Sequence, residues 1–163
     1  EELAALGLQY RNTDPDSSIY YCNSFNATLK ASYDESIGTI NIISQDIGRV
    51  ALNLFTNAFH AVAEKLAHTK IAGGTYEPTV SINTRKTTGK VEIRVEDNDN
   101  GIPSKIQDKI FQPFFTTKPT GQGTGLGLSL AYDTVKAHGG ILKMETIEGK
   151  WSVFIVQLPD TFV

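Results

Sequence analysis

Residues 44–70 constrain the fold of this chain most, because apolar side chains recur there at helical spacing. The apolar set comprises Ile47, Val50, Ala51, Leu54, Phe55, Ala58, Val62 and Leu66. Such spacing gives a helix one apolar face, which another layer of structure must cover. The segment "AGGTYEP" that follows is rich in helix-breaking residues. We therefore predict a long amphipathic helix that begins near Ser44 or Gln45 and ends near Lys70.

The segments around this helix alternate apolar and polar residues, which predicts strands. Residues 79–86 and 90–97 flank a short turn, as do residues 140–146 and 151–158, so we expect two β-hairpins. Residues 25–32 and the short apolar run 37–43 predict two further strands, and residues 128–138 predict a second helix. Hairpins join antiparallel strands and forbid a purely parallel sheet. The fold class is therefore α+β, a two-layer α/β sandwich with a mixed, mostly antiparallel sheet covered by helices.

Composition narrows the class of protein. The chain has 163 residues, 40% of them hydrophobic, which suits one domain with a sizeable core. Its net charge of −3 gives no basic balance for nucleic acid or an anionic membrane. The single cysteine, Cys22, cannot form an intrachain disulfide and fits a reducing compartment. No apolar run is long enough to span a membrane, so we expect a cytoplasmic, soluble domain.

The first residues differ in composition from the remainder. Residues 1–9 are weakly helical in pattern, and turn-forming residues gather around Pro15. We therefore divide the chain into an N-terminal segment or linker, residues 1–18, and one folded domain, residues 19–163.

A polar stripe accompanies the apolar face of the long helix, formed by Asn53, Asn57, His60 and Glu64. Asparagine is a mediocre helix former, so two at one-turn spacing need an explanation. The stripe is either a solvated edge or a site where an amide oxygen binds a hard cation such as Mg²⁺. In the second interpretation His60 would meet a phosphate.

The segment "VEDNDNGIP", residues 95–103, ends a predicted strand in Asp97 and continues into turn residues. Gly101 there can take a positive φ or let a ligand come close. The segment is either an ordinary hairpin end on the surface or the place where a strand delivers a carboxylate to a pocket. In a pocket, Asp97 could accept a hydrogen bond from an exocyclic amine.

Residues 111–129, "FQPFFTTKPTGQGTGLGLS", are small, donor-rich or basic after the phenylalanines. Glycines let successive N–H groups converge on an anion, and the N-terminus of the following helix adds unpaired donors. The pattern is neither a G-K-[ST] phosphate loop nor a dinucleotide fingerprint. The segment is either a flexible loop without ligand or a mobile cover over phosphates.

Four of these stretches, in this order, resemble the motifs of one family. "NLFTNAFHA" is similar to the N box, "DNDNG" to the G1 box, "FQPFF" to the F box and "GTGLGLS" to the G2 box. Together they resemble the ATP-binding catalytic domain (HATPase, GHKL superfamily) of bacterial two-component sensor histidine kinases. The resemblance covers residues 25–158 and implies a Bergerat-type fold that binds ATP and Mg²⁺ between the long helix and a flexible lid.

The resemblance also implies roles by position. Asn57 would be the Mg²⁺ ligand, Asp97 the acceptor for the adenine amino group, and Asn57, His60 and Lys118 the catalytic set. The residues implied to bind the nucleotide are Asn53, Asn57, His60, Asp97, Gly101, Ile102, Phe114, Thr117, Lys118, Gly123, Thr124, Gly125, Leu126, Gly127 and Leu128. Two positions depart from the family pattern: Asp99 replaces the first G1 glycine, and Trp151 replaces a glycine of the last hairpin. We expect the Asp99 charge to weaken ATP binding, and Trp151 to act only on its own turn.

The function implied is delivery of the ATP γ-phosphoryl group to a histidine on a separate dimerisation domain, with a response regulator downstream. No acceptor motif surrounds His60, His68 or His138, so we expect no autophosphorylation by this chain alone and a monomer in solution. Residues 1–10 would then be the end of a dimerisation helix. The alternatives are a regulatory or docking module that binds nucleotide without phosphotransfer, and a protein kinase of the same superfamily with a serine acceptor.

Overall fold

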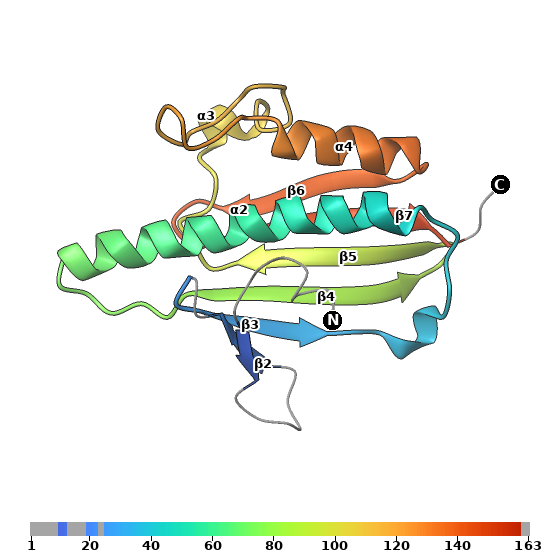
Figure 1. Cartoon of the computed structure of the whole chain (residues 1–163), viewed down its shortest axis with the longest axis horizontal. Coiled ribbons are helices and arrows are strands. Elements are labelled where there is room, and N and C mark those ends of the chain that lie inside the picture. Colours follow the sequence, from blue (N-terminus) through green and yellow to red (C-terminus); the bar gives the residue numbers. More distant parts are fainter. Residues whose placement is uncertain (1–9, 13–18, 23–24, 161–163) are drawn as a thin grey trace.

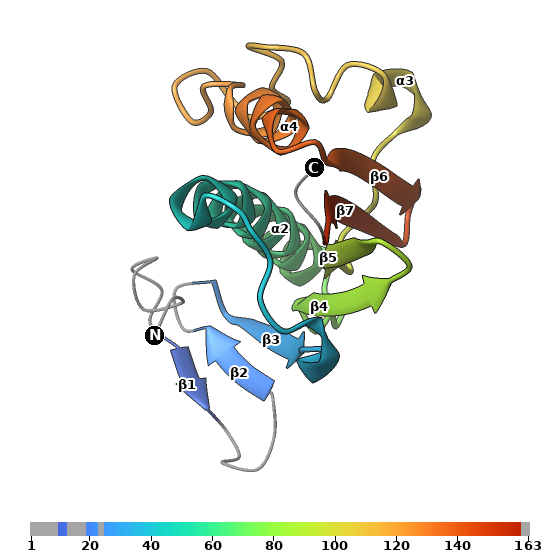
Figure 2. The same ribbon diagram turned by 90° about the vertical axis from the view of Figure 1, so that its right-hand side faces the viewer.

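A seven-stranded sheet with two helices on one face dominates the part of the chain that the structure describes (Figures 1 and 2). This structure, a computed structural model, describes residues 10–12, 19–22 and 25–160. The strands are β1 Tyr10–Asn12, β2 Ile19–Cys22, β3 Ala27–Ser32, β4 Thr79–Thr87, β5 Lys90–Asp97, β6 Ile141–Ile147 and β7 Trp151–Pro159. The helices are α2 Ser44–Ile71, α3 Ser104–Gln107, α4 Gly127–Ala137 and the 3₁₀ helix η1 Glu35–Ile37. The predicted two-layer α/β sandwich is confirmed.

Sheet order is β1-β2-β3-β4-β5-β7-β6, and β3 with β4 is the parallel pair among the neighbours in this order. All the other neighbouring strands are antiparallel. A parallel pair needs a long crossover, which α2 supplies between β3 and β4. The sheet is therefore mixed and mostly antiparallel, as predicted.

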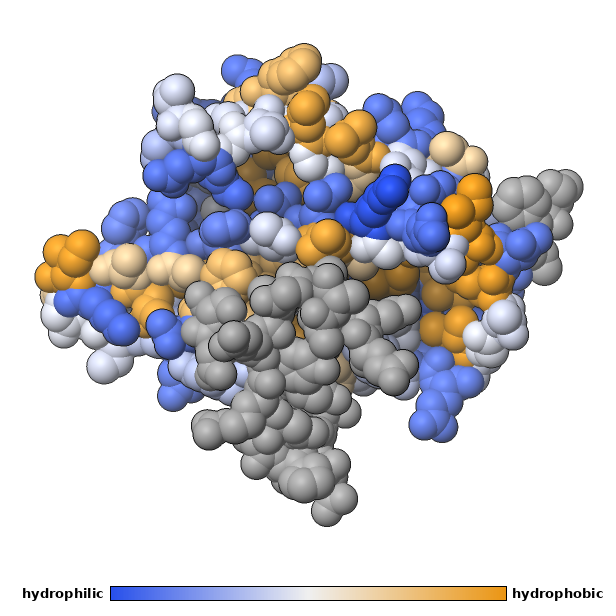
Figure 3. Space-filling model, viewed as in Figure 1, coloured by the Kyte–Doolittle hydropathy of each residue, from blue (hydrophilic) through white to orange (hydrophobic). Residues whose placement is uncertain are grey.

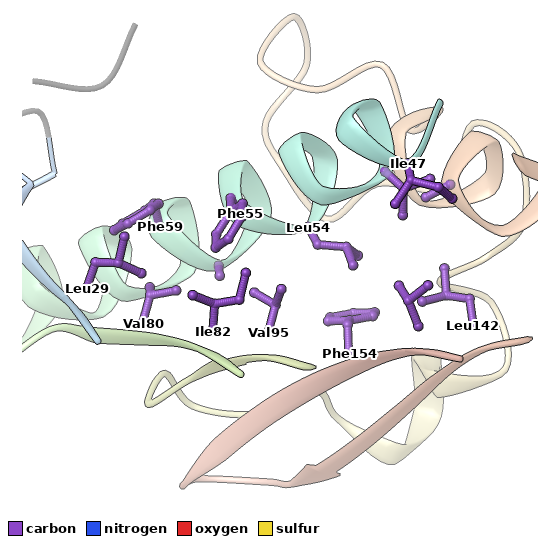
Figure 4. Close-up of a cluster of buried hydrophobic side chains, with 14 of the residues drawn as sticks. Leu29, Ile47, Leu54, Phe55, Phe59, Val80, Ile82, Val95, Leu142 and Phe154 are labelled. Carbon is purple, nitrogen blue, oxygen red and sulfur yellow. The ribbon is translucent and has the colours of Figure 1, made fainter. Parts of the chain in front are cut away.

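The core lies between α2 and the sheet. Leu54, Phe55 and Phe59 project from α2 toward Val80 of β4 and Val95 of β5 (Figure 4). Phe59 is fully buried, and so are Val80 and Val95. Burial of such side chains contributes about 1.5–3 kcal/mol each, so this apolar face fixes α2 against the sheet and turns its polar stripe away from it.

One sequence expectation is wrong. Residues 37–43 do not form a strand: η1 precedes them, and the chain then runs irregularly to α2. The carboxylate of Asp34 caps η1 by accepting from the Ser36 amide at 2.9 Å, and Gly38 follows at φ 64°. Ile40 and Ile42 still pack on the core. Their alternation therefore reflects burial of a connecting segment and not strand pairing.

The N-terminal side carries strands that we did not predict. β1 pairs with β2, and β2 with β3, so Tyr10–Asn12 and Ile19–Cys22 extend the sheet. Residues 1–9, for which the sequence pattern predicts weak helicity, lie outside the described residues, and the division of the chain at residue 18 stays a prediction. Among the described residues, no helix is long and apolar enough to cross a membrane.

Candidate functional site

A cavity of about 870 Å³ opens between α2, the turn after β5 and the segment before α4. We call this cavity the cleft, and residues 111–126 the lid segment. On the face shown in Figure 3, hydrophilic side chains border the hollow along α2. The predicted site residues that line the cleft are Asn53, Asn57, His60, Asp97, Gly101, Ile102, Thr117, Lys118, Gly123, Thr124, Gly125, Gly127 and Leu128.

Two predicted site residues are not among those that line the cleft. Phe114 is 74% exposed and has φ 66°, a left-handed conformation that is unusual for an aromatic residue. Leu126 is the N-cap residue of α4. The F box and the G2 box therefore each contain a residue that does not line the cleft.

The polar stripe of α2 faces the cleft, because its apolar face is turned to the sheet. The Asn53 amide donates to the carbonyl oxygen of Gly127 at 3.3 Å and so joins α2 to the start of α4. Among the described residues, none forms a hydrogen bond with the Asn57 side chain. That half-buried amide oxygen is free to bind a ligand.

The donor set of the cleft fits Mg²⁺ bound through a nucleotide. Within the described residues, no cluster of three or more histidine, cysteine or acidic side chains could hold a metal ion. Mg²⁺ often takes one or two protein oxygens and completes its shell with waters and phosphate oxygens. The Asn57 amide supplies one such oxygen, so the cleft suits Mg²⁺ only together with a phosphate ligand.

His60 of α2 and Lys118 of the lid segment both line the cleft and interact electrostatically. Burial lowers the pKa of the His60 imidazole, and the nearby Lys118 charge lowers it further. His60 is therefore neutral at physiological pH and can donate a hydrogen bond from one ring nitrogen. The Phe25 ring packs edge-on against the imidazole, with centroids 5.3 Å apart. Lys118 thus carries the positive charge of this region.

Asp97 ends β5 and lies at the wall of the cleft with only 4% of its surface exposed. Burial raises the pKa of its carboxyl to about 9, and a hydrogen bond with Asp99 and the Asp99 charge add to the rise. The ligand-free protein therefore keeps a proton on Asp97 at neutral pH. A buried carboxyl with a strongly raised pKa at the wall of a cleft is a candidate functional residue.

The turn after β5 accommodates Asp99 without backbone strain. Gly101 takes the positive φ, 65°, whereas Asp99 does not have a positive φ. The Asp99 carboxylate accepts from the Gly101 amide at 2.6 Å and closes the turn locally. A side chain at Gly101 would collide with the carbonyl of Ile147 in β6. The Asp99 departure therefore changes the charge of the site and not its shape.

Glycines of the lid segment are needed for close packing. Gly125 has φ 68°, and a Cβ there would collide with the backbone of Phe114. A Cβ on Gly123 would come within 2.8 Å of the Thr116 hydroxyl. The two ends of the lid segment thus touch across these glycines. No side chain caps the N-terminus of α4, so its first amides remain available to an anion.

Several cleft residues escaped the sequence analysis because they belong to no motif. Lys65 comes from α2, and Ser152 and Phe154 come from β7. Ser152 lies opposite Asp97 in the β5–β7 register, and its hydroxyl donates weakly to Asp99 at 3.4 Å. The pairing of β5 with β7 brings Ser152 and Phe154 to the site, and the packing of α2 on the sheet brings Lys65.

Comparison with known proteins identifies the family to which a domain with this cleft belongs. Residues 43–161 match the family described as histidine kinase-, DNA gyrase B- and HSP90-like ATPase. The chain belongs to this ATPase family. The match includes α2, the turn after β5, the lid segment and α4, and it confirms the family resemblance drawn from the four boxes.

Individual relatives place the ATPase domain among sensor kinases. The chain is 34% identical over 132 residues to the sensor histidine kinase ZraS of Salmonella typhimurium, covering 80% of this chain and 25% of that protein. Sporulation kinase C of Bacillus subtilis is 35% identical over 135 residues, covering 82% and 28%. The chain thus spans about a quarter of the length of these curated relatives.

A solved structure supports the same assignment. The nucleotide-free catalytic domain of the histidine kinase ThkA superposes with a TM-score of 0.68 at 30% identity, covering 85% of this chain and 82% of that one. The chain is therefore a histidine-kinase-type ATPase catalytic domain in sequence and in fold.

Proposed function

We propose that this domain binds Mg-ATP in the cleft and delivers the γ-phosphoryl group to a histidine on a separate dimerisation domain, upstream of a response regulator. The supporting observation is that one cleft combines a buried carboxyl, Asp97, with the free amide of Asn57 and the cation of Lys118. The carboxyl suits the amine of adenine, and the other two suit a metal-bound triphosphate.

Each of the main cleft residues then has a defined role in binding the nucleotide. Asp97 accepts the hydrogen bond of the adenine amine, and it accepts more strongly once its carboxyl has released its proton. Gly101 and Ile102 border the base, and the amides at Gly123, Gly125 and Gly127 face the phosphates. Asn57 holds Mg²⁺, which when bound offsets the negative charge of the phosphates.

Positioning and electrostatics provide most of the catalysis in phosphoryl transfer. Lys118 neutralises charge on the γ-phosphoryl oxygens, and neutral His60 donates a hydrogen bond to the triphosphate. The acceptor histidine comes from the partner domain, because none of the chain's histidines lies in an acceptor motif. We expect the isolated chain to be monomeric and the domain to work on the cytoplasmic side, as part of a soluble or membrane-bound receptor.

Calorimetric titration with Mg-ADP and a non-hydrolysable ATP analogue tests the proposal. Wild type should bind both, and Asn57→Ala should weaken binding by about tenfold or more and remove its dependence on Mg²⁺. Incubation of the chain alone with Mg-ATP should give no phosphohistidine, and addition of an acceptor domain should give it. Binding that is identical in wild type and Asn57→Ala would contradict the Mg²⁺ assignment.

The charge of Asp99 supports one alternative, a regulatory module that binds nucleotide weakly and transfers no phosphate. Asp99 helps to hold the proton on Asp97 and so opposes binding of the adenine amine. If wild type binds no nucleotide and Asp99→Gly restores binding, this alternative replaces the kinase. A serine-containing acceptor tested beside the histidine-containing one would identify the third possibility, a serine kinase.

A further inference from the structure

We propose that Lys65 and Tyr76, which lie outside all four motifs, are positioning residues for the adenine end of the cleft. They form what we call the latch, a set of contacts that ties the turn at residues 97–101 to α2 and to the connection between α2 and β4. This inference rests on the proposed function, because it assigns the latch a role in recognition of the base.

Lys65 joins the helix to the turn directly. Its ammonium donates to the carbonyl oxygen of Asn98 at 3.0 Å and to that of Asp99 at 2.8 Å. Hydrogen bonds from a charged donor are roughly twice as strong as neutral ones. Lys65 lies two turns beyond Asn57 on α2, so one helix carries both the free amide and the anchor of the turn.

Tyr76 makes the second half of the latch. Its hydroxyl donates a hydrogen bond to Asn98 that is shared between the side-chain oxygen at 2.8 Å and the main-chain carbonyl oxygen at 3.1 Å. Its ring lies under the Lys65 ammonium, 4.7 Å from the centroid. Burial, followed by the charges of Asp99 and Asp97, raises the pKa of the Tyr76 hydroxyl, so it stays protonated and remains a donor.

Asn98 is held on every side by these contacts. Its side-chain oxygen also accepts from the Thr79 amide at 2.9 Å, and its side-chain nitrogen donates to the carbonyl of Glu77 at 2.9 Å. Asn98 lies between Asp97 and Asp99 in the chain. The backbone of Asp97 is paired with Val80 and Ser152 in the sheet. Fixing Asn98 therefore fixes Asp99, whose amide donates to the Asp97 carboxyl at 3.2 Å and so sets the direction of that carboxyl.

The opposite flank of the turn is held by the β6–β7 hairpin. The Ile102 amide donates to the Thr146 hydroxyl at 2.9 Å, and the Gly149 amide to the carbonyl of Asn100 at 2.6 Å. The turn is thus clamped between this hairpin and the latch. Loss of the latch frees the half of the turn formed by Asn98 and Asp99, directly after Asp97, while the half that carries Ile102 stays in place.

Two substitutions test the latch with matched controls. Lys65→Met keeps the aliphatic stem and removes the donors, and Tyr76→Phe removes one hydroxyl and keeps the ring. Lys70→Met removes an exposed charge from the last turn of the same helix, and Tyr21→Phe removes an exposed hydroxyl. Each protein is titrated with Mg-ADP and with Mg-IDP, whose base has an oxygen in place of the amine.

We expect wild type and both controls to prefer ADP. Each latch variant should bind ADP about tenfold more weakly and IDP with little change, so the preference falls. In an Asp97→Asn background, Lys65→Met should cost no further affinity for ADP, because the latch acts through Asp97. In the free latch variants, hydrogen exchange at the amides of Asp99 and Gly101 should be faster than in wild type.

The outcomes separate the two levels of inference. Latch variants that keep the wild-type preference for ADP would overturn the positioning role while leaving the proposed function intact. Equal weakening of ADP and IDP would do the same, because it indicates a merely structural role. A wild type that binds neither nucleotide would overturn the proposed function and this inference with it. If Lys65→Met does not fold, Tyr76→Phe decides alone.

Discussion

Asp97 is a residue at which function and stability oppose each other. At about pH 7 its carboxyl is ionised in the unfolded chain but protonated in the fold, where its pKa is about 9. The folded state therefore binds an extra proton, and this group makes stability fall as pH rises from about 4 to about 9. Asp97→Asn, which mimics the protonated carboxyl, should raise the free energy of unfolding by about 1–2 kcal/mol near pH 7.

Urea denaturation at two pH values measures this effect. The gain should shrink toward zero near pH 3–4, because the carboxyl is then largely protonated in both states. The same variant should lose the preference for ADP over IDP. A variant that is less stable than wild type near pH 7 would show that Asp97 is ionised and satisfied in the free protein.

Elements differ in how far sequence could predict them. The bounds of α2 follow from its apolar spacing, and both hairpins follow from alternation around turn residues. Residues 37–43 carry a similar pattern, yet Ile40 and Ile42 pack partly buried against the core without a strand partner. An alternating hydropathy pattern indicates which side chains are buried, but a strand also needs a partner strand to pair with. For the same reason the motifs indicated Asp97, but not Lys65 or Tyr76, whose contacts exist only in the folded chain.

The sheet face opposite the helices gives a prediction at the scale of the element. Buried Glu92 of β5 accepts from Gln157 of β7 at 2.6 Å and from Arg85 of β4 at 2.7 Å, and so ties three strands together. The Gln157 hydrogen bond, offset in part by burial, lowers the pKa of the Glu92 carboxyl, with Arg85 adding to the fall. Its contribution is present above the ordinary glutamate pKa and is lost as pH falls through the lowered value.

Gln157→Leu should therefore destabilise the protein by about 1–2 kcal/mol near pH 7. The difference from wild type should decrease once the pH falls below the pKa of Glu92 in the fold. Chemical denaturation across this range measures both, with Gln112→Leu in the exposed part of the lid segment as the control. An effect of Gln157→Leu that does not vary with pH would mean that packing, and not the carboxylate, accounts for the loss.

On the scale of the whole molecule, the cleft joins segments that are distant in sequence: α2, the turn after β5, the lid segment and β7. A ligand that contacts all of them stabilises the folded state by RT ln(1 + [L]/Kd), about 2.7 kcal/mol at a hundredfold excess over Kd. For a domain of this size that corresponds to a rise in Tm of about 5–10 °C.

Mg-ADP should produce this rise in Tm in wild type, and ADP with EDTA should produce only a small part of it. Asn57→Ala at the same concentrations should show the small rise with or without Mg²⁺, because only the metal-dependent contacts are gone. A rise in wild type that is equal with Mg²⁺ and with EDTA would place the nucleotide in the cleft without a metal and remove Asn57 from the site.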